Sequence, residues 1–217
     1  MKLIVKLFFI AGVALITSCI NNSTSKENTA DTTEVVDETA IAQQQLAAAF
    51  PEEYQFFKNQ DSSFTPQKFV ETETDTIHTE PALAVNETLK KYYPYFIYNP
   101  DSTYAIDLYS YNIVLVNKDG KTVGKAGGPD TEVGLVDLKN HTRRRVYFGG
   151  SSSAVLNAKW INDNEFLLMT GEIIKDEAFS PTVLKYTLPA HTLVRFVYED
   201  TLSVRPSEYV DARLNIE

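Results

Sequence analysis

The sequence predicts a mainly β fold in which antiparallel hairpins form two repeats, preceded by a disordered tether and a short helical segment. From residue 92 onward, aromatic and β-branched runs alternate with turns rich in Asn, Asp and Gly, which is typical of strands joined as hairpins. One turn pattern recurs along the chain, which indicates an internal repeat. Residues 19–45 have neither an aromatic residue nor an apolar period, so they predict a flexible, acidic tether.

The composition sets the broad class of protein. The chain has 217 residues, of which 43% are hydrophobic, and a formal net charge of −9. This length leaves room for a substantial apolar core, so disorder of the whole chain is excluded. The acidic balance argues against a nucleic-acid partner, because such surfaces favour an excess of Lys and Arg. The single Cys excludes an intrachain disulfide.

The first element is a targeting segment over residues 1–18. Lys2 and Lys6 supply its positive charge, and a short apolar run follows them. The run ends in Ile16-Thr17-Ser18-Cys19, which resembles a bacterial lipoprotein signal: an aliphatic residue, two small residues and a cysteine. The resemblance implies that Cys19 becomes the acylated first residue of the mature chain and carries palmitate-type lipid. An ordinary signal peptide and a short membrane anchor are the alternatives.

The residue after Cys19 bears on the destination of such a lipoprotein. Ile20 is not the aspartate of an inner-membrane retention signal, so the resemblance implies the outer membrane. The periplasmic face and the cell surface both stay open. Two or three acyl chains, at about 0.8 kcal/mol per buried CH₂, anchor a protein stably. The membrane, reached through the lipid on Cys19, is therefore the first predicted partner.

Residues 46–91 predict a helical and loop segment. Strong helix formers surround Leu46, and Pro51 followed by two glutamates suits the first turn of a second helix. The acidic, Thr-alternating stretch 71–76 has two interpretations, a cation-binding or glycosylated strip and a solvated linker or edge strand. It lacks the ligand spacing of a calcium loop, which favours the second interpretation.

Residues 92–217 predict an antiparallel β domain. The Asp119-Gly120 pair tolerates positive φ and suits a tight hairpin turn. Asp107 and Asp137 stand inside apolar strand patterns, so they are the acids expected to be buried. The expected strands are 92–98, 104–109, 113–116, 133–138, 143–148, 155–161, 166–170, 183–188 and 193–198.

The internal repeat has two parts. Residues 98–106 align with 160–168 at an offset of 62, each with an Asp turn between two aromatic residues. Residues 137–142 align with 187–192 at an offset of 50. Each copy, about 95–149 and 157–199, thus contains two hairpins, the unit of a propeller blade.

The turn pattern in these copies resembles the blade repeats of TolB-type β-propellers. Together with the lipoprotein signal, it makes the chain similar to uncharacterised envelope lipoproteins of Bacteroidota-type bacteria. A propeller ring needs about four to eight blades, so two blade-like copies cannot close one. A compact two-sheet structure or a wrapped antiparallel structure, either of them sharing one core, is favoured instead.

Two sets of residues are candidates for an interaction surface. Arg143, Arg144 and Arg145 form a basic run in an acidic protein, and strand geometry puts the first and third on one face. They suit an anion or partner contact, or a charged edge that resists strand addition. The exposed-tyrosine candidates are Tyr95, Tyr109 and Tyr111, whose alternative role is core packing.

These observations favour a non-enzymatic interaction or structural module tethered in the cell envelope, with an envelope protein as partner. No HExxH, CxxC or spaced His pair is present, so neither a metal nor a cofactor is expected. A glycan-binding module is the alternative, and it requires the tyrosines to be exposed in one patch. An enzyme is the third hypothesis, and it requires one pocket that gathers residues such as Asp107, Asp137, His141 and Arg145.

Overall fold

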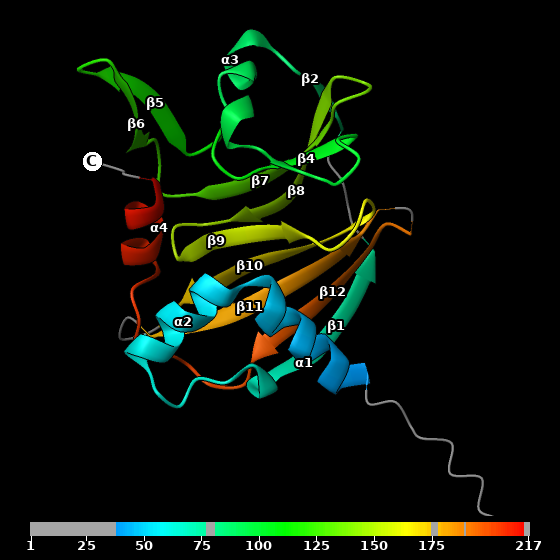
Figure 1. Ribbon diagram of the computed structural model, residues 1–217, viewed down its shortest axis with the longest axis vertical. Coiled ribbons are helices and arrows are strands. Elements are labelled where there is room, and N and C mark those ends of the chain that lie inside the picture. Colours follow the sequence, from blue (N-terminus) through cyan, green and yellow to red (C-terminus); the bar gives the residue numbers. More distant parts are fainter. Residues whose placement is uncertain (1–37, 77–80, 175–177, 189, 215–217) are drawn as a thin grey trace, which may run out of the picture. The chain divides into compact units, whose positions relative to one another are not determined.

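Two five-stranded antiparallel sheets form the body of the protein (Figure 1). The computed structural model describes residues 38–76, 81–174, 178–188 and 190–214. Sheet A has the strand order β1 (Phe69–Thr76), β12 (Thr192–Tyr198), β11 (Phe179–Thr187), β10 (Glu165–Ile173) and β9 (Ser153–Trp160). Sheet B has the order β2 (Leu83–Ala84), β8 (Thr142–Gly149), β7 (Thr131–Asp137), β4 (Tyr104–Asp107) and β3 (Ile97–Tyr98). The predicted mainly β, antiparallel class is confirmed.

The remaining elements are short. The β5 (Ile113–Lys118) and β6 (Lys121–Ala126) strands form a separate hairpin, and Asp119 and Gly120 at its turn have φ of 53° and 80°. The helices are α1 (Glu38–Ala49), α2 (Pro51–Gln60), α3 (Glu87–Lys90) and α4 (Pro206–Leu214), with 3₁₀ turns η1 (Pro66–Lys68) and η2 (Tyr93–Tyr95). Among the described residues, none of these helices is long and apolar enough to cross a membrane.

The N-terminal helices cover one face of sheet A. As predicted, α2 begins at Pro51 and has Glu52 and Glu53 in its first turn. The first helix begins at Glu38, earlier than the expected Leu46, because the residues between them are themselves good helix formers. The signal peptide and most of the predicted tether, including Cys19, lie outside the described residues.

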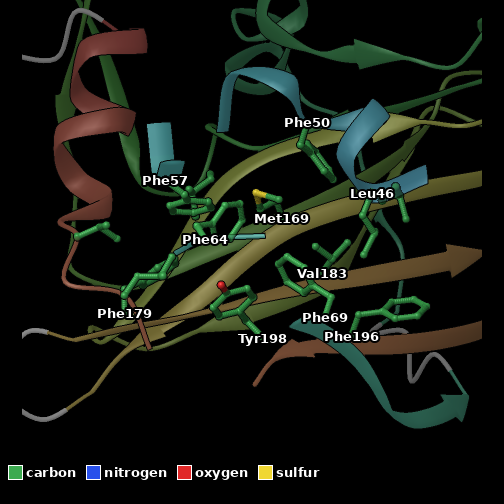
Figure 2. Packing of buried hydrophobic residues seen from close by; sticks show 14 residues of the cluster. Leu46, Phe50, Phe57, Phe64, Phe69, Met169, Phe179, Val183, Phe196 and Tyr198 are labelled. Carbon is green, nitrogen blue, oxygen red and sulfur yellow. The ribbon is translucent and has the colours of Figure 1, made fainter. Parts of the chain in front are cut away.

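The core under these helices is rich in aromatic residues (Figure 2). Phe57 and Phe64 lie with ring centroids 5.0 Å apart, and Phe64 stacks on Tyr198 of β12 at 5.1 Å. Leu167 and Met169 of β10 point into the same cluster. The aromatic segment between α2 and β1 is therefore a buried part of the helix-to-sheet interface.

A second core fills the space between the two sheets. Phe166 and Leu168 of β10 point into it, whereas Leu167 and Met169 point toward the helices, as the alternation of a strand requires. Ile106 of β4 enters this core from sheet B. The two sheets thus share one apolar layer, which agrees with the favoured two-sheet arrangement.

The outer face of sheet B is covered in part by α3 and η2, which Figure 1 shows on the far side of that sheet from sheet A. Leu89, Tyr92 and Phe96 pack there against Ala105 and Val136. The Asn86 side chain caps α3 by accepting a 2.9 Å hydrogen bond from the Leu89 amide.

The two predicted copies each form a four-stranded meander, β3-β4-β7-β8 in sheet B and β9-β10-β11-β12 in sheet A. The β7–β8 and β11–β12 hairpins share one register at the offset of 50: Asp137 faces Thr142, and Thr187 faces Thr192. His141 and His191, at equivalent turn positions, have φ of 52° and 49°. Both histidines therefore hold the left-handed turn conformation.

No propeller blade is found in the part of the chain that the structure describes. Blades related by rotation around a channel would stack the front of one on the back of the next. Here the equivalent residues Ile106 and Leu168 both enter the core between the sheets. The meanders therefore pack face to face, and each buries its equivalent apolar face against the other.

Residues before the expected β domain also join the sheets. The acidic stretch 71–76 lies in β1, the edge strand of sheet A, in agreement with the favoured interpretation. Leu83 and Ala84 form β2 and pair with Arg143 and Thr142 at the edge of sheet B. Both meanders thus gain a fifth strand from the segment that precedes them in the sequence.

Candidate functional site

A buried network of charges lies on the outer face of sheet B. Arg143 of β8 donates from Nε to Asp107 Oδ2 at 2.7 Å and from Nη1 to Glu132 Oε1 at 2.5 Å. The Arg145 guanidinium lies 3.6 Å from the second Glu132 oxygen. The Asp107 and Glu132 side chains are only 1% and 9% exposed. Two acids and two arginines therefore face one another, and of the four only the Arg145 side chain, at 36% exposed, has substantial contact with solvent.

The end of β4 is shaped to hold the Asp107 carboxylate. Its Oδ1 atom accepts hydrogen bonds from the backbone amides of Tyr109 and Ser110, at 3.1 and 2.9 Å, and the Ser110 hydroxyl donates to Oδ2. Burial opposes the charge on Arg143, but Asp107 and Glu132 outweigh it and raise the pKa of the guanidinium above its ordinary value. The Arg143 guanidinium thus keeps its charge.

A glycine makes room for the Arg143 guanidinium. A Cβ atom at Gly134 of β7 would lie 2.4 Å from both Cζ and Nε of Arg143, well inside van der Waals contact. The flat guanidinium therefore lies directly against the backbone of β7. The Nη2 atom of the same group is buried and has no hydrogen-bond acceptor among the described residues.

We expect Gly134→Ala to lower the free energy of unfolding by about 1–3 kcal/mol, because the new methyl group displaces a guanidinium held by two carboxylates. An alanine in an unobstructed strand would instead stabilise it slightly. Gly128→Ala is the matched control, since nothing lies within 4 Å of its added Cβ. Urea denaturation of both variants measures the difference. Equal stability of the two variants would contradict the close approach.

A groove with a volume of about 370 Å³ opens beside this network. It lies between β2, α3, the loop after β4 and the outer face of sheet B, and we call it the sheet B groove. Its apolar and aromatic lining comes from Leu83, Ala84, Leu89, Tyr92 and Tyr111, and its polar lining from Asn86, Thr88, Ser110, Glu132 and Arg143. Apolar walls with a few polar side chains are typical of ligand-binding sites.

Exposed aromatic rings stand at the edge of the groove. The Tyr111 side chain is 49% exposed and meets the 48% exposed Phe148 edge to face, with ring centroids 6.1 Å apart. The Arg145 guanidinium lies 5.2 Å from the centre of the Phe148 ring. Leu83, at 71% exposed, lines the groove from the edge strand. These side chains form an amphipathic rim.

The predicted interaction residues separate into two groups. Arg143, Arg145 and Tyr111 lie at the groove or its network, as described above. Tyr109 is half-buried and packs against the cores on both sides of sheet B. Tyr95 is exposed on η2. Arg144 pairs with Leu135, whose side chain faces the core between the two sheets and not the groove. Neither Tyr95 nor Arg144 lines the groove.

The four residues required by the enzyme hypothesis do not gather in the groove. Asp107 and Arg145 join the charge network, whereas Asp137 and His141 lie at the β7–β8 turn. Burial raises the pKa of Asp137, but hydrogen bonds from Asn140 and the nearby Arg144 outweigh it and leave the pKa below its ordinary value. Within the described ranges, no three His, Cys, Asp or Glu side chains are placed to hold a metal ion.

Sequence reasoning missed Glu132, Leu83, Ser110 and Phe148 as members of the site. Glu132 gave one usable signal, since a charged residue inside the apolar run 131–136 needs a partner when it is buried. The other three became visible only through the pairing of β2 with β8 and the path of the loop after β4.

The comparisons with known proteins give no relative for this arrangement. No protein-family description, no curated protein and no solved structure matches the chain. The site therefore has to be interpreted from its own geometry.

Proposed function

We propose that this protein is a lipid-anchored, non-enzymatic binding protein of the cell envelope that engages its ligand or partner through the sheet B groove. One observation carries the binding part of the proposal. An open groove of about 370 Å³ combines exposed apolar and aromatic side chains with polar groups on a rigid sheet face. Soluble domains rarely expose such a surface without using it.

The charges beside the groove support binding rather than catalysis. A general acid or base needs a proton that it can exchange with a substrate at working pH. Asp107 instead holds Arg143 and two backbone amides, and both Glu132 oxygens lie near arginines. These carboxylates are occupied by contacts within the protein that hold the sheet face in shape.

The anchor rests on the lipoprotein-type sequence that ends at Cys19. We expect cells fed radiolabelled palmitate to label the protein, and Cys19→Ala to abolish the label, because this is the only thiol in the chain. Cys19→Ala also moves the protein out of the membrane fraction. Ile20→Ala serves as the control and keeps both properties. Palmitate labelling that survives Cys19→Ala would overturn the anchoring proposal.

The same proposal includes the location and the origin of the fold. The outer membrane is the favoured destination, and the two four-stranded meanders are repeats of one unit of two hairpins. Their equal strand order and the shared register of the β7–β8 and β11–β12 hairpins support the repeat. The two Asp turns also meet directly, since the Asp101 amide donates to Asp163 Oδ1 at 3.0 Å.

Binding through the groove is tested with the full mature lipoprotein immobilised in detergent and exposed to solubilised envelope material. Leu83→Asp places a charge on the most exposed apolar residue of the groove lining, which is 71% exposed. Tyr95→Asp is the control at an exposed position outside the groove. We expect wild type and Tyr95→Asp to retain the same protein or polysaccharide and Leu83→Asp to lose it. Equal retention by all three would refute groove binding.

A further inference from the structure

Resting on the proposed binding function, we propose that the ligand of the sheet B groove is a neutral saccharide, stacked on Tyr111 and hydrogen-bonded by the polar side chains of the groove. Three features of the groove support this ligand: its charge balance, its exposed aromatic ring and the hydrogen-bonding capacity of its lining.

The charge balance favours an uncharged ligand. Arg143 is held between Asp107 and Glu132, and Arg145 approaches Glu132 from the other side. The two positive and two negative side chains cancel, so neither an anionic nor a cationic ligand finds an unopposed charge here. A charged ligand would also lose its own hydration without an equivalent partner, which is costly.

The aromatic ring favours a ligand with flat apolar faces. Tyr111 is half-exposed and is supported from one side by its edge-to-face contact with Phe148. Leu83, Ala84 and Leu89 continue the apolar lining. A pyranose ring presents C–H groups on its faces, and these pack against an aromatic ring by dispersion.

The polar groups favour a ligand with many hydroxyls over a purely apolar peptide. The Ser110 hydroxyl donates to Asp107 and so keeps its lone pairs for a donor from the groove. The Asn86 carbonyl oxygen is used by the α3 cap, which leaves its amide group to donate. Thr88 adds a further hydroxyl. The lining thus offers both donors and acceptors, as hydroxyl groups require.

A purely apolar occupant would cover these polar groups without satisfying them. Each buried polar group left without a hydrogen bond costs about 1–3 kcal/mol. A sugar ring, in contrast, has apolar faces and a polar edge, which matches an aromatic rim beside a polar lining.

The test is isothermal titration calorimetry on the full mature lipoprotein in a detergent without a sugar headgroup. The probes are maltohexaose, cellohexaose and chitohexaose, with hexagalacturonate as the charged comparison. We expect at least one neutral hexasaccharide to bind, Tyr111→Ala to weaken it by about tenfold or more, and Tyr111→Phe to retain it. Tyr95→Ala, an exposed tyrosine outside the groove, leaves the affinity unchanged.

Three outcomes would overturn the saccharide inference: no binding of any neutral hexasaccharide, wild-type affinity in Tyr111→Ala, or preferential binding of hexagalacturonate. Failure here is distinguishable from failure of the proposed function. If Leu83→Asp still abolishes the retention of an envelope protein while no hexasaccharide binds, the groove binds a protein and only the saccharide is wrong.

Discussion

We expect Asp107→Ala to lower the free energy of unfolding by about 3–5 kcal/mol, one of the largest effects of any single substitution in this protein. The Asp107 side chain is 1% exposed and its Oδ2 atom lies 2.7 Å from Arg143 Nε. Its removal leaves a buried guanidinium without one of its two carboxylates and leaves two backbone amides, of Tyr109 and Ser110, without an acceptor. Urea denaturation followed by Trp160 fluorescence measures the loss.

The matched control for this prediction is Asp200→Ala. Asp200 forms an ion pair of the same length, 2.7 Å, with Lys68, but its side chain is 63% exposed. Because solvent screens that pair, we expect it to contribute less than about 1 kcal/mol. The comparison isolates burial from ion pairing. Equal losses in the two variants would show that the network on sheet B is not buried in solution.

We expect Phe166→Ala to destabilise the protein by about 3–5 kcal/mol through the core that the two sheets share. Phe166 is fully buried, stacks on Tyr186 with centroids 4.6 Å apart and meets Trp160 at 5.0 Å. Its loss opens a cavity between sheets that cannot close without moving both. Phe148→Ala, which removes a 48% exposed ring from sheet B, is the control and costs about 1 kcal/mol or less.

The same experiment tests whether the sheets fold together. Trp160 reports on the shared core, and far-ultraviolet circular dichroism reports on all strands. We expect the two signals to give one coincident urea transition in the wild type and in Phe166→Ala. Two separate transitions would contradict a shared core.

Many strands and turns of the fold could be predicted because short local residue patterns determine them. The apolar run 166–170 correctly indicated a strand, which the structure shows as part of β10. Phe166 and Leu168 of that strand face one core, and Leu167 and Met169 face the other. The Asp119-Gly120 turn was predictable for a similar reason, since positive φ favours these residue types.

The arrangement of the strands was less accessible from the sequence. The repeat suggested blades, but whether two meanders stack front to back or face to face depends on contacts between Ile106 and residues about sixty positions away, such as Leu168. The short edge strand β2 was missed in the same way. Nothing local in the dipeptide Leu83-Ala84 indicates pairing with β8, because edge pairing depends on the position of a distant strand.

In the candidate site too, the features set by local sequence could be predicted and those set by long-range contacts could not. Strand alternation correctly put Arg143 and Arg145 on one face, and the apolar surroundings of Asp107 correctly indicated burial. The sequence offered an anion contact or a charged edge as roles for the arginines. Their contacts instead are with Asp107 and Glu132, and the exposed surface is supplied by side chains from three separate segments. A groove built by long-range pairing has no continuous motif.

The central claim, that the sheet B groove is the binding surface, is tested most directly by photo-crosslinking in intact cells. A benzophenone amino acid replaces Tyr111 or, in a second strain, Tyr95; these side chains are 49% and 38% exposed. Benzophenone inserts into C–H bonds and therefore captures a protein or a saccharide. We predict an adduct from position 111 that Leu83→Asp abolishes, and none from position 95. Equal adducts from both positions, or an adduct from position 95 alone, would contradict the claim.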